Sequence, residues 1–256
     1  MHRFFITERD LKNDVALLSP EDTRHARDVL RLDAGDHIVL VIPDGPQYVA
    51  QITLVGPSRM AAQILREQTC APEPPVKITL YQGIPKGDKM DMAVQKCTEL
   101  GIHKIVPVFC RRTVIRWDET KCRERQQRWQ RIAKEAARQS RRGSYPQVAF
   151  PVEFERTVTG LDVTLADKET LGLVPWEQER RHGVKQILKS HKHVKNILLW
   201  IGPEGGLDPS EVAMVTRAGG LPVSLGPRIL RSETAGLVVV AILLYEFGDL
   251  GEGYME

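Results

Sequence analysis

Two short apolar runs, each followed at once by a glycine turn, constrain the fold of this chain more than any other feature. Residues 197–201 read ILLWI and lead into GPEGG. The second run, 221–225, leads into Gly226-Pro227. Runs of this length fit buried strands. Because open α/β sheets bind ligands at the carboxyl ends of their strands, the two turns predict a ligand site. Glycine also lets a ligand reach backbone groups, since it has no side chain.

The pattern around these turns predicts an α/β fold with a mostly parallel sheet, because short apolar strands alternate with helical segments from residue 76 onward. Asp208, Pro209 and Glu211 together form a helix start, with an N-cap, a first-turn proline and a carboxylate three residues after the cap. Strands are expected at 76–82, 105–109, 171–174, 197–201 and 221–225, and helices at 88–100, 119–140, 177–188 and 234–247. Gly172-Leu173-Val174 adds a third glycine position that could meet the two turns in one pocket.

The first 70 residues predict a small β-rich domain. A helix is expected at 20–30 and strands at 37–42, 48–54 and 60–65, and a stiff linker follows at Pro72-Glu73-Pro74-Pro75. Three arginines share one face of the helix, either as a phosphate-facing stripe or as ordinary solvent-exposed side chains. They are Arg24, Arg27 and Arg31.

Positive charge is concentrated in one segment. Residues 111–142 hold twelve Lys or Arg against four Asp or Glu, whereas the whole chain has a net charge of only +3. Such a segment indicates either a polyanion partner or a solvated helix face. The candidates for phosphate contacts are Arg111, Arg112, Arg138, Arg141 and Arg142.

The sequence lacks the motifs of several functional classes. The sequence contains no GxxxxGK[ST], no GxGxxG and no GxSxG. Its four cysteines form no zinc pattern, and His191 and His193 have no nearby acidic or thiol ligand, so no metal site is expected. No apolar run reaches the roughly 20 residues of a membrane span, and the amino end has no apolar core of signal-peptide length. A cytoplasmic protein with reduced cysteines is expected.

Three motifs carry a resemblance to a known family: IGPEGGL at 201–207, LGPRILRSETA at 225–235 and QGIPKGDKMD at 82–91. The chain resembles the bacterial ribosomal RNA uridine-N3 methyltransferases of the RsmE type, which belong to the SPOUT superfamily. The likeness spans nearly the whole chain. It departs at Ser232, where the family usually has threonine, although the hydroxyl is kept.

The resemblance implies a PUA-like RNA-binding β-barrel at 1–71 and a SPOUT methyltransferase domain with a trefoil knot at 72–256. It implies S-adenosyl-L-methionine (SAM) as the methyl donor, held at the glycine turns, with Glu204 either meeting the ribose hydroxyls or capping its turn. The residues expected around the cofactor are Leu173, Val174, Gly202, Pro203, Glu204, Gly205, Leu225, Gly226, Ile229, Leu230 and Thr234. A homodimer through the C-terminal region is also implied.

The expected activity is methylation of N3 of a uridine in 16S ribosomal RNA, with the RNA or the 30S subunit as partner. Arg231 is the candidate that stabilises negative charge on the uracil, or it contacts a phosphate or pairs with Glu233. Glu233 is a possible general base, as is water. The alternatives are a SPOUT enzyme that methylates ribose 2′-oxygen and a non-catalytic RNA-binding or ribosome-assembly protein on the same fold.

Overall fold

The computed structural model describes residues 1–251 and divides the chain into two compact units. The first unit contains Met1–Glu73 and Glu135–Tyr145, and the second contains Pro74–Lys134 and the chain from Pro146 onward. The segment 135–145 therefore belongs with the first unit, which differs from the expected division into domains at 1–71 and 72–256. The reason is packing, since Ala137 is fully buried with Phe5 and Tyr145 lies edge-on to the Phe5 ring at 4.8 Å.

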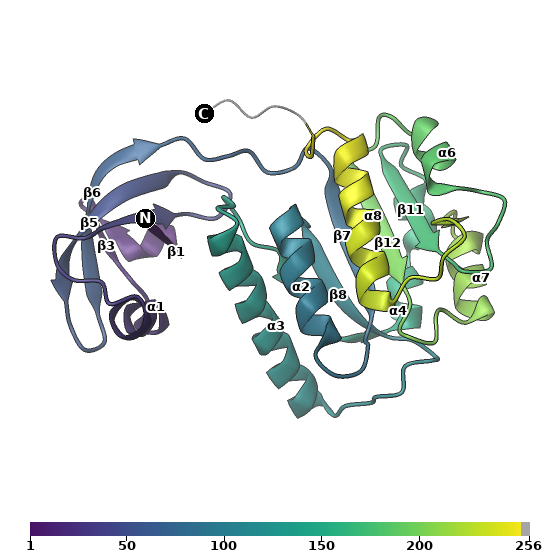
Figure 1. Cartoon of the computed structure of the whole chain (residues 1–256), viewed down its shortest axis with the longest axis horizontal. Helices are drawn as coiled ribbons and strands as arrows, with labels where there is room; N and C mark the ends of the chain where they lie inside the picture. The colour runs from purple at the N-terminus through teal and green to yellow at the C-terminus, as the bar shows by residue number, and fades with distance from the viewer. Residues whose placement is uncertain (252–256) are drawn as a thin grey trace. The chain divides into compact units, whose positions relative to one another are not determined.

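The first unit is built on a six-stranded sheet in the order β1-β4-β5-β6-β3-β2, of which β1, β3, β5 and β6 are labelled in Figure 1. β1 runs parallel to β4, and the other neighbours are antiparallel. The strands are β1 His2–Phe5, β2 Leu11–Lys12, β3 Val15–Leu17, β4 His37–Val41, β5 Gln47–Val55 and β6 Met60–Gln68. Phe4, Ile38, Leu40, Ile52 and Met60 form the centre of its core.

A helical segment crosses this unit where the sequence predicts one. The hydroxyl of Ser19 accepts a hydrogen bond from Asp22 N at 3.1 Å, and α1 (Pro20–Arg24) begins with a proline at its first position. The helical path continues as a π-turn over His25–Val29. It ends before Arg31, whose backbone is left-handed at φ 56°.

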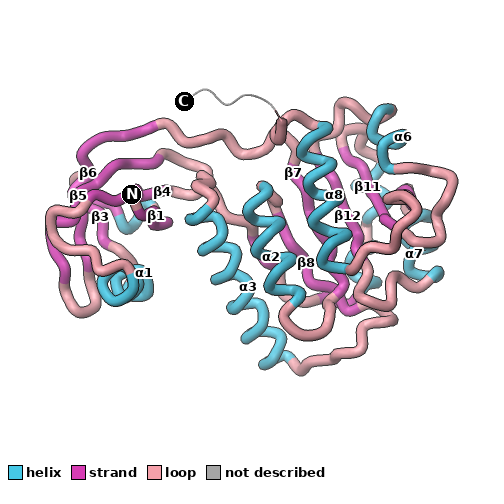
Figure 2. Tube along the Cα trace, viewed as in Figure 1, coloured by secondary structure: helices cyan, strands magenta, loops and turns pink. Residues whose placement is uncertain are grey.

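The second unit contains a seven-stranded sheet, and every pair of neighbouring strands in it is parallel. The expectation of a parallel α/β sheet is therefore confirmed. The order is β10-β8-β7-β12-β11-β13, with β9 beside β8, and Figure 2 shows the central strands β8, β7, β12 and β11. The strands are β7 Lys77–Gly83, β8 Lys104–Phe109, β9 Gln147–Val148, β10 Val152–Glu153, β11 Thr170–Pro175, β12 Asn196–Ile201 and β13 Leu221–Val223.

Alternating side chains of these strands enter two separate cores. On β12, Leu199 packs with α2 and α8 on one face, whereas Trp200 packs with α4, α5 and α7 on the other. Figure 1 shows α2 beside α8 over the first face. The helices are α2 Lys89–Leu100, α3 Glu119–Gln139, α4 Phe154–Val158, α5 Leu161–Leu165, α6 Val184–Lys189, α7 Pro209–Arg217 and α8 Ser232–Glu246.

Local details depart from the sequence expectations near the carboxyl ends of β11 and β13. The helix expected at 177–188 exists only as α6, because Gly183 bridges Ser224 and Val184 N donates to Ser224 O at 3.1 Å. The same bridge ends β13 at Val223 rather than at residue 225. Gly172 lies inside β11, where a Cβ would stand 3.2 Å from the Gly220 Cα.

Within residues 1–251, none of the helices combines the length and apolar character needed to cross a membrane.

Candidate functional site

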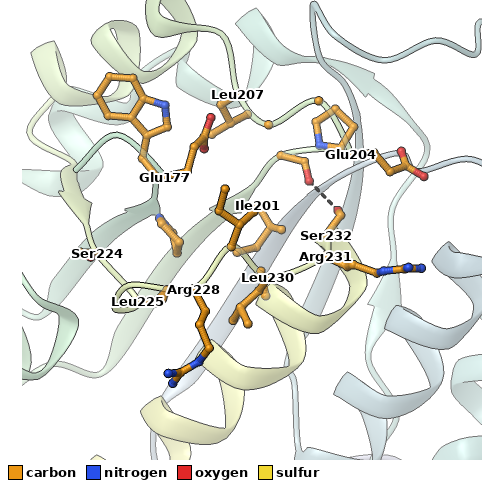
Figure 3. A pocket seen from close by; sticks show the side chains of 18 of the residues that line it. Glu177, Ile201, Glu204, Leu207, Ser224, Leu225, Arg228, Leu230, Arg231 and Ser232 are labelled. Atoms are coloured by element: carbon orange, nitrogen blue, oxygen red, sulfur yellow. Dashed lines mark hydrogen bonds between the residues drawn. The ribbon is translucent and has the colours of Figure 1, made fainter. Parts of the chain in front are cut away.

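A cavity of about 700 Å³ opens where three neighbouring strands end. Pro175 ends β11, Ile201 ends β12 and Ser224 follows β13, and all three line the cavity. The walls come from the turns after these strands, and Lys89 and Ala235 complete them. Figure 3 shows side chains from all three turns facing this space. The convergence of turns expected from the sequence is present, but the turn after β11 is 175–177 and does not contain Gly172.

Close backbone approach explains the glycines of the loop 202–206. A Cβ on Gly202 would lie 2.6 Å from the carbonyl carbon of Gly206. Gly206 adopts φ 70°, and a Cβ there would stand 2.8 Å from Glu177 Oε1. A Cβ on Gly83, at the end of β7, would meet Pro203 N at 2.6 Å. Side chains at these positions would push the loop out of its path, so this wall requires glycine.

Charged side chains hold the same loop in place. Glu204 Oε1 accepts hydrogen bonds from Lys89 Nζ at 2.7 Å and from Lys86 N at 3.0 Å. Partial burial raises the pKa of Glu204, but these hydrogen bonds outweigh it and leave the pKa below its usual value. Arg112 Nη1 donates to Gly205 O at 2.8 Å. The loop is thereby tied to α2 and to the segment after β8.

Glu211 anchors the loop to the start of α7. Its carboxylate is fully buried and accepts from Arg111 N at 2.9 Å and from Asp208 N at 2.8 Å. Asp208 caps the helix in return, and its side chain accepts from Ser210 N at 3.0 Å. The helix start expected from Asp208, Pro209 and Glu211 is therefore confirmed.

The loop 224–231 forms the opposite wall. Gly226 adopts φ 105°, which a side chain would strain. Arg228, Ile229 and Arg231 are exposed on this loop, with Ile229 at 86%. The side chains of Arg228 and Arg231 extend in opposite directions in Figure 3. The Ser232 hydroxyl donates to Gly202 O at 2.5 Å and joins this wall to the other glycine loop.

The structure places most of the expected cofactor residues around the cavity. Gly202, Pro203, Glu204, Gly205, Leu225, Gly226, Ile229 and Leu230 all line it, as does Arg231. Leu173 and Val174 are completely buried in the two cores and are absent from the wall, which corrects their expected place. Thr234 and Glu233 are also absent from the wall. Glu233 is 8% exposed, and its Oε2 has no hydrogen-bond partner within residues 1–251.

Sequence reasoning missed part of the wall. Trp176 and Glu177 follow β11 without any glycine signal, and Lys89 comes from the start of α2. The one sequence feature that could have indicated Trp176 and Glu177 is their position directly after an apolar run that is typical of a strand. Arg228, Leu207, Ser224 and Ser232 also line the cavity.

Two of the arginines expected to contact RNA have structural partners within the first unit. Arg138 forms an ion pair with Asp22, and the two side chains are 11% and 3% exposed. Arg142 pairs with Glu73 and is 10% exposed. These guanidinium groups are therefore mostly buried and already paired with carboxylates, and their contact with RNA stays a prediction. Arg24, Arg31, Arg111, Arg112 and Arg141 are exposed, whereas Arg27 is half-buried and pairs with Asp28.

Comparison with known proteins gives one consistent result. Residues 72–244 match the family model described as an RNA methyltransferase domain. A protein of Bacillus subtilis named ribosomal RNA small subunit methyltransferase E is 31% identical over 96% of this chain and 97% of its own length. A protein of the same name from Aquifex aeolicus is 30% identical over 95% of this chain and 99% of its own.

Solved structures agree with the sequence relatives. The ribosomal RNA small subunit methyltransferase E of Neisseria gonorrhoeae, bound to S-adenosyl methionine, has a TM-score of 0.84 at 32% identity and covers 98% of this chain and 99% of its own. A methyltransferase of Legionella pneumophila in complex with SAM also has a TM-score of 0.84, at 30% identity, covering 95% of this chain and 96% of its own.

Proposed function

This chain belongs to the RNA methyltransferase family, and we propose that it transfers the methyl group of SAM to N3 of a uridine in the 16S ribosomal RNA of the small ribosomal subunit. The observation that carries the proposal is the single cavity at the ends of β11, β12 and β13, framed by the two glycine loops. Its position is where open α/β sheets hold their ligands.

The residues around the cavity fit SAM. A volume of about 700 Å³ suits a small-molecule ligand. Ile201, Leu207 and Leu225 offer apolar surface for the adenine. The indole N–H of Trp176 is buried and has no hydrogen-bond partner within residues 1–251, so it is a donor that a ligand could satisfy. The Glu177 carboxylate lines the cavity and makes no hydrogen bond or ion pair with any residue of 1–251. Its negative charge is therefore available to a ligand with cationic groups.

SAM supplies an activated methyl group on a cationic sulfur, so the chain's own residues mainly have to align donor and acceptor. Arg231 lies exposed at the rim and forms no ion pair with any residue of 1–251. In this proposal its guanidinium donates to a uracil carbonyl oxygen as N3 loses its proton, and so stabilises the developing negative charge. The proton passes to water, because Glu233 is absent from the cavity wall.

Each unit has exposed cations that could contact RNA phosphates. Arg111 and Arg112 lie beside the glycine loop, and Arg24, Arg31 and Arg141 are exposed on the first unit, which acts as a PUA-like RNA-binding domain in this proposal. Their phosphate contacts give affinity without reading sequence. The uridine enters the cavity as an extruded base. The place of action is the cytoplasm, where the ribosomal RNA is.

The C-terminal part of the second unit is a SPOUT-like trefoil knot in this proposal. The path of the chain supports this. β13 lies at the edge of the sheet, whereas α8, the helix that follows it, packs on α2, β7 and β12 in the middle of the unit. α8 has apolar side chains on nearly every side, and Val238 and Ile242 remain partly exposed. These residues form the contact of a homodimer in this proposal.

The test is to map modified nucleotides by mass spectrometry in 16S RNA from a strain that lacks the gene. A uridine methylated at N3 should be missing there and should return when the gene is restored. A missing ribose 2′-O-methyl group would instead identify a different methyltransferase activity. Absence of SAM binding to the purified protein at millimolar ligand would favour a non-catalytic RNA-binding protein.

A further inference from the structure

A glutamine at the end of β7 is connected to both glycine loops of the cavity although it does not line the cavity itself. Gln82 is fully buried, and its Nε2 donates to Ser232 Oγ at 2.8 Å and to Gly83 O at 3.1 Å. Ser232 Oγ donates in turn to Gly202 O at 2.5 Å, as the dashed line in Figure 3 shows. Three segments far apart in the sequence are thereby linked by one line of hydrogen bonds.

The donors and acceptors of this line allow one arrangement only. The Gly202 carbonyl can only accept, so the Ser232 hydroxyl must donate its single proton there. The same hydroxyl must then accept from its other neighbour, and Gln82 has to present its NH₂ group rather than its carbonyl oxygen. The second N–H of that group meets the Gly83 carbonyl. This network fixes the orientation of the Gln82 amide.

This orientation leaves one polar atom without a partner. Gln82 Oε1 is buried and accepts no hydrogen bond within residues 1–251. It faces Gly236 of α8, where a Cβ would stand 3.0 Å away. Burying an acceptor without a partner costs free energy, and an apolar side chain of similar shape would remove that cost. The two hydrogen bonds that the amide donates and the one acceptor that it leaves unpaired offset each other, so the amide contributes little net stability to the fold.

We propose that Gln82 is a positioning residue for the methyl donor, which acts through Ser232 to fix the spacing between the loops 202–206 and 224–231. The inference rests on the proposed function. Ser232 directly follows Leu230 and Arg231, which line the cavity, and Gly202 begins the opposite wall. Holding the Ser232 hydroxyl against the Gly202 carbonyl sets the width of the cavity and the direction from which Arg231 leaves the backbone.

The spacing matters because methyl transfer depends on alignment. A displacement of about 1 Å between donor and acceptor can lower the rate about a hundredfold. Without Gln82, the Ser232 hydroxyl could still donate to Gly202, but nothing would hold its rotation from the opposite side. Loss of the amide should therefore loosen the cavity more than it loosens the fold.

The first test replaces Gln82 with methionine, which has similar length and no amide. The affinity for SAM is measured by calorimetry in the full chain, together with kcat, KM and Tm. In Gln82→Met we expect SAM binding about tenfold weaker and a larger fall in kcat, with Tm about equal to that of wild type, because the hydrogen bonds lost and the unpaired acceptor removed offset each other. Unchanged affinity and kcat, or a lower Tm with unchanged affinity, would overturn the inference.

A matched control removes an equivalent hydrogen bond far from the cavity. Gln126 Nε2 donates to Val148 O at 2.9 Å on the second unit. Gln126→Met should leave SAM affinity unchanged. The wild-type protein is measured first: if it fails to bind SAM, the proposed function fails, whereas equal binding by wild type and Gln82→Met defeats only the positioning role.

A double-mutant cycle tests whether Gln82 acts through Ser232. Ser232→Ala should weaken SAM binding at least as much as Gln82→Met, because it removes both hydrogen bonds, and Ser232→Thr should restore the affinity. The double variant should bind about as weakly as Ser232→Ala alone, since residues in one network are not additive. If the fold-losses in SAM affinity of the two single variants multiply in the double variant, the two residues act independently, and the inference that Gln82 acts through Ser232 would be overturned.

Discussion

Lys89 and Glu204 join the first turn of α2 to the glycine loop after β12, with Lys89 Nζ 2.7 Å from Glu204 Oε1. Lys86 N donates to the same oxygen at 3.0 Å. The loop wall therefore depends on a carboxylate that must remain ionised. Burial raises the pKa of Glu204, but the hydrogen bonds and the charge of Lys89 lower it by more, so the pKa lies below its usual value in the folded protein.

This pKa predicts how the contribution of Glu204 depends on pH. Because the pKa is lower in the folded state, the stabilising effect is present above the unfolded pKa and is lost as pH falls through the folded value. We expect wild type to unfold at a higher temperature than Glu204→Gln at pH 6. The difference in Tm should shrink below about pH 4.5 and disappear in stronger acid. Thermal unfolding from pH 3 to 7 measures it, and a difference that does not depend on pH would contradict the expectation.

Glu177 should contribute to cofactor affinity without contributing to stability. Its carboxylate lines the cavity and has no ion pair or hydrogen bond within residues 1–251. Attraction between this charge and the cationic groups of SAM is screened at the rim, so Glu177→Gln should weaken binding about three- to tenfold. Its Tm should equal that of wild type.

Calorimetry with SAM at two salt concentrations checks this, because the effect of the substitution should be smaller at high salt. Glu124→Gln is the control, since Glu124 is exposed on α3 and pairs with Lys121. Equal affinity of Glu177→Gln and wild type at low salt would show that Glu177 does not meet the ligand.

Much of this site could be predicted from local sequence signals. The apolar run at 197–201 and its glycines place a loop at a strand end because both features act over a few residues. Asp208, Pro209 and Glu211 define the start of α7 for the same reason. The local signals therefore indicate that the turns at 202–206 and 226–227 could meet in one cavity, whereas the place of Leu230 in its wall came from the family resemblance.

The remainder depends on contacts between distant segments. Trp176 and Glu177 have helix-compatible neighbours, but Trp176 N donates to Val223 O and Gly183 pairs with Ser224, so the stretch between them follows β13 instead of forming a helix. Leu173 and Val174 are expected beside the cofactor. Their strand is covered on both faces, so their side chains lie in opposite cores instead. The ion pair of Arg138 with Asp22 joins residues 116 positions apart, so the basic pattern of α3 could not reveal it.

Arg231 should affect turnover far more than cofactor affinity. If its guanidinium stabilises charge that develops on the uracil, Arg231→Ala should lower kcat about a hundredfold or more and change the Kd of SAM by less than about threefold. Calorimetry and steady-state methylation of small-subunit RNA measure the two effects separately.

Arg228→Ala is the matched comparison, because it removes the same charge from the same loop. Its effect should appear mainly in KM for RNA, as expected for a phosphate contact. Equal losses of kcat in the two variants would indicate a general electrostatic effect of the loop, and equal loss of kcat and SAM affinity in Arg231→Ala would make Arg231 a cofactor contact.

Two arginines three residues apart should separate stability from RNA binding in the first unit. Arg138 is buried in its ion pair with Asp22, so Arg138→Ala removes a buried guanidinium and its hydrogen bond to this carboxylate, and should cost roughly 2 kcal/mol of stability. Arg141 is exposed, so Arg141→Ala should leave Tm within about 2 °C of wild type and weaken RNA binding a few-fold at low salt. Chemical denaturation and RNA titrations at two salt concentrations measure both effects. If Arg141→Ala destabilised the fold as much as Arg138→Ala, or bound RNA like wild type at low salt, the assignment of Arg141 to the RNA-contacting surface would be wrong.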